Sequence, residues 1–309
     1  MFKKVVLLLL LIALDFLSLA QQEPTYTHFT FNPLTINPAV AGSKELLTVT
    51  ALSRARWLKF PGAPKTHNLT MHSILKTTRL GGGFSFLNDS KGPMQSTGID
   101  LDVAYRLPLK EGVLSFGLKA GVRFLSIGLQ SEVVTVDAGD AAFQNDIVLK
   151  PLPNFGFGVY YSHNDFYAGF SAPKLFENKL NVSSINNNSF EERNYYLTLG
   201  GAFNLNTDQS IKLKPSLLVK MTESTLIQFD ANFLFYFNDK FWLGPMYRST
   251  NDIGLLAGLN INTQLKFGYA LDWSFGNKTA TYNNGTHEIM LSYDFVFDKK
   301  QGIVSPRHF

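Results

Sequence analysis

The chain has 309 residues, no cysteine and a formal net charge of +4 at pH 7. The lack of cysteine excludes disulfides, thiolate metal sites, cysteine catalysis and a lipid anchor on an N-terminal cysteine. The charge is too small to indicate a nucleic-acid partner, and charged residues make up only 17% of the chain, against about 25% in a typical soluble protein.

The N-terminus reads MFKKVVLLLLLIALDFLSLAQQEP and has the three parts of a secretory signal peptide. Two lysines precede an apolar stretch at 5–14, and small residues lead to a cleavage site between Ala20 and Gln21. The apolar stretch is shorter than the roughly 20 residues that a spanning helix needs, and no later stretch approaches that length. We therefore predict an exported protein without a transmembrane helix.

Period-two alternation of apolar and polar residues follows a polar, proline-containing lead-in at 21–45 and is typical of strands with two different faces. In 286–297, one face carries almost only apolar and aromatic residues, whereas the other carries Glu288 and Asp294. We expect about fourteen such strands, most of them roughly 9 to 14 residues long, which suits tilted strands that cross a bilayer. They are predicted to begin near residues 46, 66, 79, 96, 112, 153, 164, 193, 211, 224, 240, 252, 264 and 286.

The connections between the predicted strands alternate between long and short. The three longest, at about 126–152, 173–192 and 276–285, are the fifth, seventh and thirteenth, whereas even-numbered connections such as 163–165 and 238–239 are tight. Outer-membrane barrels have short periplasmic turns and longer outer loops. The sequence therefore predicts an all-β fold: a transmembrane antiparallel outer-membrane β-barrel of about 14 strands. A soluble all-β sandwich is the alternative, and the aromatic faces of the strands argue against it.

The predicted domains are the signal peptide at 1–20, the lead-in at 21–45, the barrel at 46–298 and a tail at 299–309. The polar face of the barrel contains many glycines, suited to a crowded lumen, and ten charged residues. Either these charges pair and brace the interior, or they line a selective pore or binding cavity. They are Asp100, Asp102, Arg106, Lys119, Arg123, Asp230, Arg248, Lys266, Asp272 and Glu288.

Motifs of enzyme chemistry are incomplete in this sequence. His287 and Glu288 begin like the HExxH helix of zinc hydrolases, but Leu291 occupies the position of the second histidine. The glycine cluster at 80–92 lacks the GKS or GKT of a phosphate loop, and no histidine accompanies a GxSxG serine. We predict no enzyme, no metal site and no cofactor.

An ordered series of short motifs spans the chain. It runs through NPLTINPAVAG at 32–42, RARWLKFPGAPKTH at 54–67, LKPS at 213–216, FGYALD at 267–272 and THEIML at 286–291. In this order the motifs resemble the PorP/SprF family of outer-membrane proteins from Bacteroidetes, from about residue 24 to the end. The positions that match family motifs are Asn37, Pro38, Gly42, Arg54, Trp57, Gly62, Pro64, Pro215, Arg248, Asp272, His287 and Glu288.

The resemblance implies a role in the type IX secretion system and in gliding motility. Barrels of this family accompany export of large surface proteins, including adhesins, whose C-terminal sorting domain they receive or anchor, and they are linked to a periplasmic ring made by a lipoprotein and its partner. We expect the lead-in at the periplasmic side or inside the barrel, and cargo contact at the loops 126–152 and 173–192 or at the barrel mouth. Candidate contacts there are Asn186, Asn187, Asn188 and Phe190. An outer-membrane porin or solute transporter remains the alternative, because a barrel of this size has a wide lumen.

Overall fold

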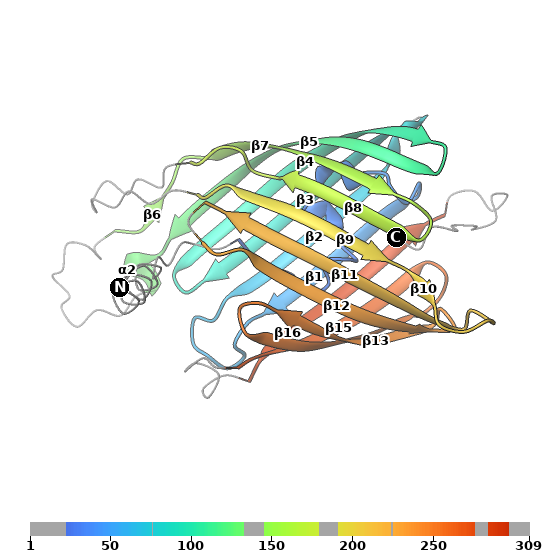
Figure 1. Cartoon of the computed structure of the whole chain (residues 1–309). Coiled ribbons are helices and arrows are strands. Elements are labelled where there is room, and N and C mark those ends of the chain that lie inside the picture. The colour runs from blue at the N-terminus through green and yellow to red at the C-terminus, as the bar shows by residue number, and fades with distance from the viewer. Residues whose placement is uncertain are drawn as a thin grey trace, which may run out of the picture.

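The computed structural model describes residues 23–75, 77–132, 145–178, 191–223, 225–275 and 284–296. Within them the chain forms a closed antiparallel barrel of fourteen long strands (Figure 1). These are β1 (Leu47–Ala55), β2 (Lys65–Leu75), β3 (Thr77–Lys91), β4 (Met94–Leu109), β5 (Gly112–Ile127), β7 (Leu152–Ser162), β8 (Phe166–Ala172), β9 (Asn194–Gly201), β11 (Ile211–Thr222), β12 (Gln228–Phe237), β13 (Phe241–Arg248), β14 (Asp252–Asn260), β15 (Leu265–Ser274) and β16 (Thr286–Phe295).

The remaining elements are short. The two-residue strands β6 (Ile147–Val148) and β10 (Phe203–Asn204) pair with β5 and β11, and α2 (Leu129–Glu132) follows β5. Two 3₁₀ helices, η1 (Pro33–Thr35) and η2 (Pro38–Val40), lie in the lead-in. None of the helices in the described ranges has the length and apolar character needed to cross a bilayer.

The barrel closes because the first and last long strands pair. β1 lies antiparallel to β16, in a register that places Arg54 opposite Glu288, and every other long strand pairs with its neighbours along the chain. Closure leaves none of the fourteen long strands in the described ranges at a sheet edge, as a bilayer requires. The predicted fold and strand number are confirmed. The largest difference between a predicted and an observed strand start is at β12, which is predicted near 224 and begins at Gln228. The prediction is early because the apolar Leu226 and Ile227 continue the pattern ahead of the strand.

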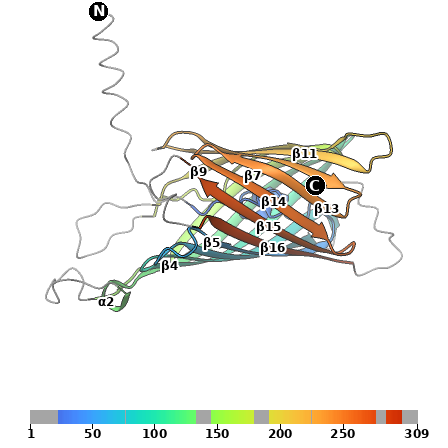
Figure 2. The ribbon, with the colours of Figure 1, turned by 90° about the horizontal axis from the view of Figure 1, so that it is seen from below.

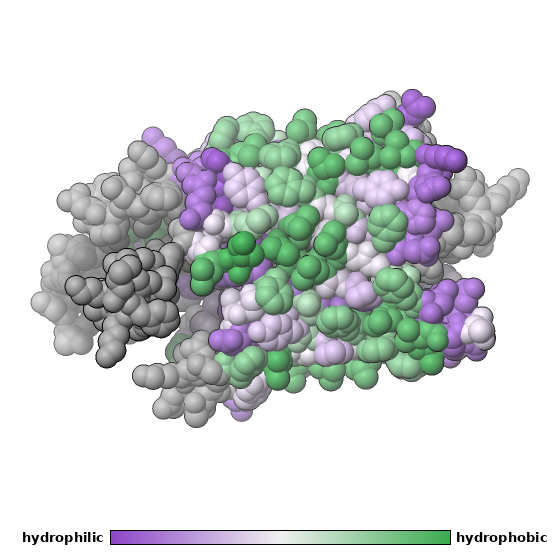
Figure 3. All heavy atoms as spheres, in the orientation of Figure 1, coloured by the Kyte–Doolittle hydropathy of each residue, from purple (hydrophilic) through white to green (hydrophobic). Residues whose placement is uncertain are grey.

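The outer face of the barrel is apolar. In β16, Ile289 and Leu291 are exposed, whereas Glu288 and Met290, which alternate with them, are fully buried. In β5, Leu118 is 69% exposed while its neighbour Lys119 points inward. Figure 3 shows apolar residues across the middle of the barrel and polar residues toward both ends. This is the surface of a protein whose strands face lipid.

The two ends of the barrel differ, and the tilted strands run between them (Figure 2). The short even-numbered connections, among them 163–165 and 261–264, lie at the end where β1 begins and β16 ends. Longer odd-numbered connections lie at the opposite end, with α2 and β6. By the usual asymmetry of outer-membrane barrels, the end with the short turns faces the periplasm and the other faces outward. We call them the periplasmic end and the outer end.

Residues 23–46 lie inside the barrel, and we call this segment the plug. Its stretch from Leu34 to Ala41 is mostly buried, and Leu34, Ala39 and Ala41 are completely inaccessible. Figure 1 shows it as the dark blue segment enclosed by the strands. The sequence left the lead-in either at the periplasmic side or inside, and the structure places it inside.

Candidate functional site

The plug is an irregular segment whose proline steps set its shape. In both 3₁₀ helices a proline stands in the first turn, where the missing N–H costs nothing. The Asn37 side chain caps the second helix by accepting a hydrogen bond from the Ala39 N–H at 2.9 Å. Since so short a segment satisfies few of its own polar groups, the rest need partners on the barrel wall.

Glu23 marks the outer end of the plug. Its carboxylate lies 3.3 Å from the Arg123 guanidinium of β5 and also pairs with Lys174, which follows β8. Burial alone raises the pKa of Glu23, but the charges of Lys174 and Arg123 outweigh it and hold the pKa far below its usual range. Glu191 contacts Arg123 at 3.0 Å, so the described part of the seventh connection joins the same cluster.

Glu288 of β16 holds the plug at Thr27 and His28, a few residues after Glu23. One carboxylate oxygen accepts the Thr27 N–H at 3.0 Å, and the other accepts the His28 N–H at 2.7 Å and lies 2.8 Å from His28 Nδ1. Both Glu288 and His28 are completely buried. A carboxylate in this position satisfies two backbone donors that the plug cannot satisfy itself.

Arg54 completes this arrangement from β1. Its guanidinium donates to Glu288 at 2.7 Å, to Asp272 at 2.6 Å and to the Thr27 hydroxyl at 2.7 Å. The Thr27 hydroxyl in turn donates to Asp272 at 2.7 Å. The three charged side chains are at most 3% exposed. We call Arg54, Asp272 and Glu288 the lock, because one guanidinium joins both carboxylates and the plug.

A second buried pair adjoins the lock. Arg248 of β13 donates to both carboxylate oxygens of Asp230 in β12, at 2.9 and 3.0 Å, and lies 3.6 Å from Asp272. Asn232 of the same strand donates to the Thr27 carbonyl at 3.0 Å. Of the two interpretations left open by the sequence, these contacts favour charges that brace the interior.

Polar contacts of the plug continue toward the other wall. The Asn32 side chain donates to Asn68 at 2.8 Å and accepts from the Thr70 hydroxyl at 2.6 Å. The Asn37 amide donates to the Val159 carbonyl at 3.0 Å, and the Ser171 hydroxyl donates to the carbonyl of residue 36 at 2.9 Å. Strands on several sides of the barrel therefore hold one segment.

Wall glycines give the plug backbone its space. A Cβ at Gly81 would lie 1.9 Å from the Ala41 carbonyl oxygen, and one at Gly117 would lie 2.2 Å from the Ala39 nitrogen. Real Cβ atoms do not approach this closely, so the plug follows a track that only glycine leaves open. Gly81 belongs to the cluster at 80–92, whose role is therefore packing.

Apolar side chains of the plug fill the remaining interior. Phe31 stacks on Trp242 with ring centroids 5.0 Å apart, within a buried cluster that includes Leu256 and Met290. Phe29 packs with Leu218 in a second cluster. The barrel thus has a packed core that the plug itself completes.

The predicted motif positions fall into three groups. Asn37, Pro38 and Gly42 lie in the plug, and the structure brings Arg54, Asp272 and Glu288 together in the lock with Arg248 beside it. Trp57, Gly62 and Pro64 lie in the first outer connection, and Pro215 lies in the periplasmic half of β11. His287 points outward, and its ring is 2.6 Å from the Tyr269 hydroxyl. The predicted positions outside the described residues are Ala20, Gln21, Asn186, Asn187, Asn188 and Phe190.

Sequence reasoning missed the plug's side of the lock, Thr27 and His28. Neither lies in a periodic pattern, so no local signal marked them. No group of three or more histidine and acidic side chains within the described residues is arranged to hold a metal ion.

Comparison with known proteins identifies both family and fold. The sequence model of the family described as type IX secretion system membrane protein PorP/SprF matches residues 18–293, most of the chain. Among curated proteins no sequence matches.

Solved structures that resemble this one are outer-membrane barrels. The CymD monoaromatic hydrocarbon channel superposes with a TM-score of 0.50 at 11% identity, covering 85% of this chain and 92% of that one. Omp33 of Acinetobacter baumannii gives 0.48 at 8% identity, with 81% and 98% coverage. A Pseudomonas aeruginosa FadL homologue gives 0.45 at 11% identity, with 89% and 95% coverage. At 11% identity, the likeness to the CymD channel shows the fold alone.

Proposed function

Because this chain belongs to the PorP/SprF family of type IX secretion system membrane proteins, we propose that it assists export and surface anchoring of specific large cargo proteins, adhesins among them. It does so as an outer-membrane barrel that binds their C-terminal sorting domain, in contact with the periplasmic ring of the machinery. The family match over residues 18–293 is the observation that carries this proposal.

The filled lumen supports docking rather than solute passage. A diffusion pore needs a continuous aqueous path, yet the plug crosses the interior and is tied to the wall by buried charges and apolar packing. The family and the barrel fold also suit a secretion component better than an enzyme. A porin or transporter is the competing function, and it requires the plug to move.

The first outer connection, residues 56–64, is a candidate docking surface for the cargo. Leu58 and Phe60 are 41% and 47% exposed there. The loop is held in place: the Leu58 N–H donates to the Gly285 carbonyl at 2.9 Å, and the Gly92 N–H donates to the Gly62 carbonyl at 2.9 Å. Exposed apolar side chains on a rigid loop favour binding, since little entropy is lost.

The test is a mild-detergent pull-down of the tagged protein from its own outer membrane, with mass spectrometry of what it retains. We expect one large surface protein, held through its C-terminal region. The variant Leu58→Ser/Phe60→Ser should retain less of it, while Leu109→Ser, an exposed apolar position near a periplasmic turn, should retain as much as the wild type. Recovery of the barrel alone, together with ion conductance in a planar bilayer, would move the assignment to a porin.

A further inference from the structure

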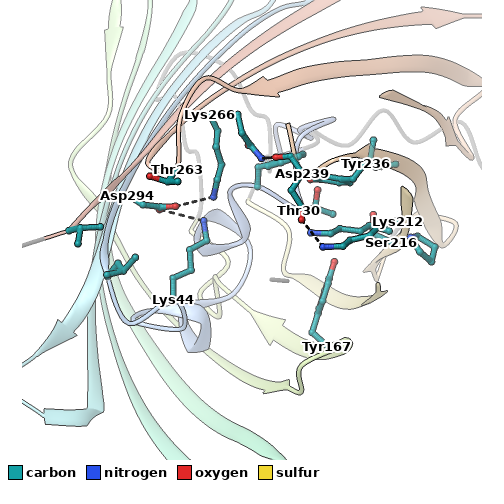
Figure 4. Close-up of a pocket in the computed structure, with 17 residues that line it drawn as sticks. Thr30, Lys44, Tyr167, Lys212, Ser216, Tyr236, Asp239, Thr263, Lys266 and Asp294 are labelled. Atoms are coloured by element: carbon teal, nitrogen blue, oxygen red, sulfur yellow. Dashed lines mark hydrogen bonds and ion pairs between the residues drawn. The ribbon is translucent and has the colours of Figure 1, made fainter. Parts of the chain in front are cut away.

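A cavity of about 400 Å³ opens at the periplasmic end of the barrel, on the far side of the plug from Glu23. Its wall comes from the plug, from the strands β8, β11, β12, β14, β15 and β16, and from Asp239 and Thr263 in two of the short turns. Figure 4 shows its side chains converging from these elements on a common space. We call it the periplasmic pocket.

Positive charge dominates the lining of the periplasmic pocket. Two aspartates, Asp239 and Asp294, face four lysines, so the formal charge of the lining is +2. Asp294 forms ion pairs with two of the lysines: its carboxylate lies 2.9 Å from Lys266 Nζ and 3.9 Å from Lys44 Nζ. The other two lysines, Lys212 and Lys214, come from β11.

The environment of Lys44 reflects this crowding. Burial, and next the neighbouring charge of Lys266, lower its pKa to about 8, against the attraction of Asp294. A lysine in such a position gains from a further anion, because an added negative charge stabilises its protonated form. The pocket therefore favours a ligand that brings negative charge.

Aromatic and polar groups share the wall with the lysines. Phe31, Tyr167 and Tyr236 line it, and the Lys214 ammonium lies 4.3 Å from the centre of the Tyr236 ring. Ser216 and Asn260 add hydrogen-bonding groups. A cavity of this volume and mixed lining accommodates several side chains and exceeds the needs of a single inorganic ion.

We propose that the periplasmic pocket binds an acidic peptide segment of a periplasmic protein, with its carboxylates against the lysines and its apolar side chains against the aromatic wall. Lipid headgroups are disfavoured, because the lysines converge on the interior of the barrel mouth and not on its lipid-facing rim. The site lies at the end opposite the proposed cargo surface, so it stands whether or not cargo binds at the outer end.

The test uses the full-length barrel in detergent and a fluorescent hexapeptide of alternating glutamate and phenylalanine, with a glutamine–phenylalanine hexapeptide as the matched probe. We expect the acidic peptide to bind at least tenfold more tightly than the neutral one. The variant Lys214→Gln/Lys266→Gln should weaken binding at least tenfold. Lys110→Gln, which removes an exposed lysine of another periplasmic turn outside the pocket, should not.

A variant that makes the pocket more positive tests the proposal even if Lys214→Gln/Lys266→Gln folds poorly. Asp239→Asn raises the positive surplus, so it should tighten binding of the acidic peptide about twofold or more. Equal binding of the two peptides, or unchanged binding in Asp239→Asn, would overturn the proposal. Complete displacement of the peptide by millimolar inorganic phosphate, or by phosphatidylglycerol vesicles, would overturn it in favour of a small-anion or a lipid site. The outcome of this peptide-binding test does not depend on whether cargo is retained in the pull-down.

Discussion

Replacing Arg54 by methionine removes the cation of the lock while keeping most of its volume. The side chain makes three contacts, of 2.6, 2.7 and 2.7 Å, to Asp272, Glu288 and the Thr27 hydroxyl. The two carboxylates are 3% and 0% exposed, so neither can recover its charge partner from water. Removing one member of a buried ion pair typically costs about 3–5 kcal/mol, and we expect Arg54→Met to fall in that range.

Guanidinium unfolding in detergent micelles, followed by tryptophan fluorescence, measures this loss. For a slope of about 4 kcal/mol per molar, the midpoint should fall by about 1 M. Lys240→Met is the matched control, because it removes an exposed cation and should change stability by less than about 0.5 kcal/mol. The double variant Arg54→Met/Glu288→Gln should be less destabilised than the sum of its parts, since one of the stranded charges is gone.

Two results would refute this reasoning. If Arg54→Met matched Lys240→Met, the guanidinium would contribute nothing to holding the two carboxylates. If the double variant were fully additive, Arg54 and Glu288 would act independently, and the lock would not exist as a unit.

Three further predictions follow from the plug and the periplasmic pocket. Gly81→Ala should destabilise the barrel by about 1–3 kcal/mol through its clash with Ala41, whereas Gly98→Ala, whose Cβ would meet nothing nearer than 3.7 Å, should be tolerated; equal unfolding midpoints would contradict the glycine track. Deletion of residues 23–42 should convert a silent barrel into a conducting one in a planar bilayer, and a deletion variant that stays silent would show that the plug does not close the lumen. Since the pKa of Lys44 is about 8, its positive charge is present below pH 8 and lost above it. The acidic peptide should therefore bind up to about fivefold more weakly at pH 9 than at pH 7. If a Lys44→Gln variant showed the same pH response, Lys44 would not be its source.

Periodicity in the sequence predicted the barrel and the inward position of two members of the lock, Asp272 and Glu288. Alternation along β16 placed Glu288 on the inward face, and the same pattern placed Asp272 there in β15. These two inferences need only local pattern. Arg54 was marked only as a family-motif position, and the register that sets it opposite Glu288 comes from the structure.

The plug could not be derived in this way. Thr27 meets Glu288 across 261 positions of the chain, and the segment around it has no period that fixes which side chains face the wall. Its path depends on where the wall leaves room, as at Gly117, and steric room is a property of the assembled barrel. For the same reason the sequence left open whether the interior charges line a pore or brace it.

The geometry also decides how the two ends of the barrel relate. Glu23 joins the cluster at the outer end, and Lys44 lines the periplasmic pocket, so one continuous segment reaches both. A ligand at one end can influence the other only by favouring a different plug position. A position that displaces Thr27 must break the lock, at a cost of about 3–5 kcal/mol. Binding at the two ends of the wild-type barrel should therefore be independent, and Arg54→Met is the background in which coupling between peptide and cargo would emerge.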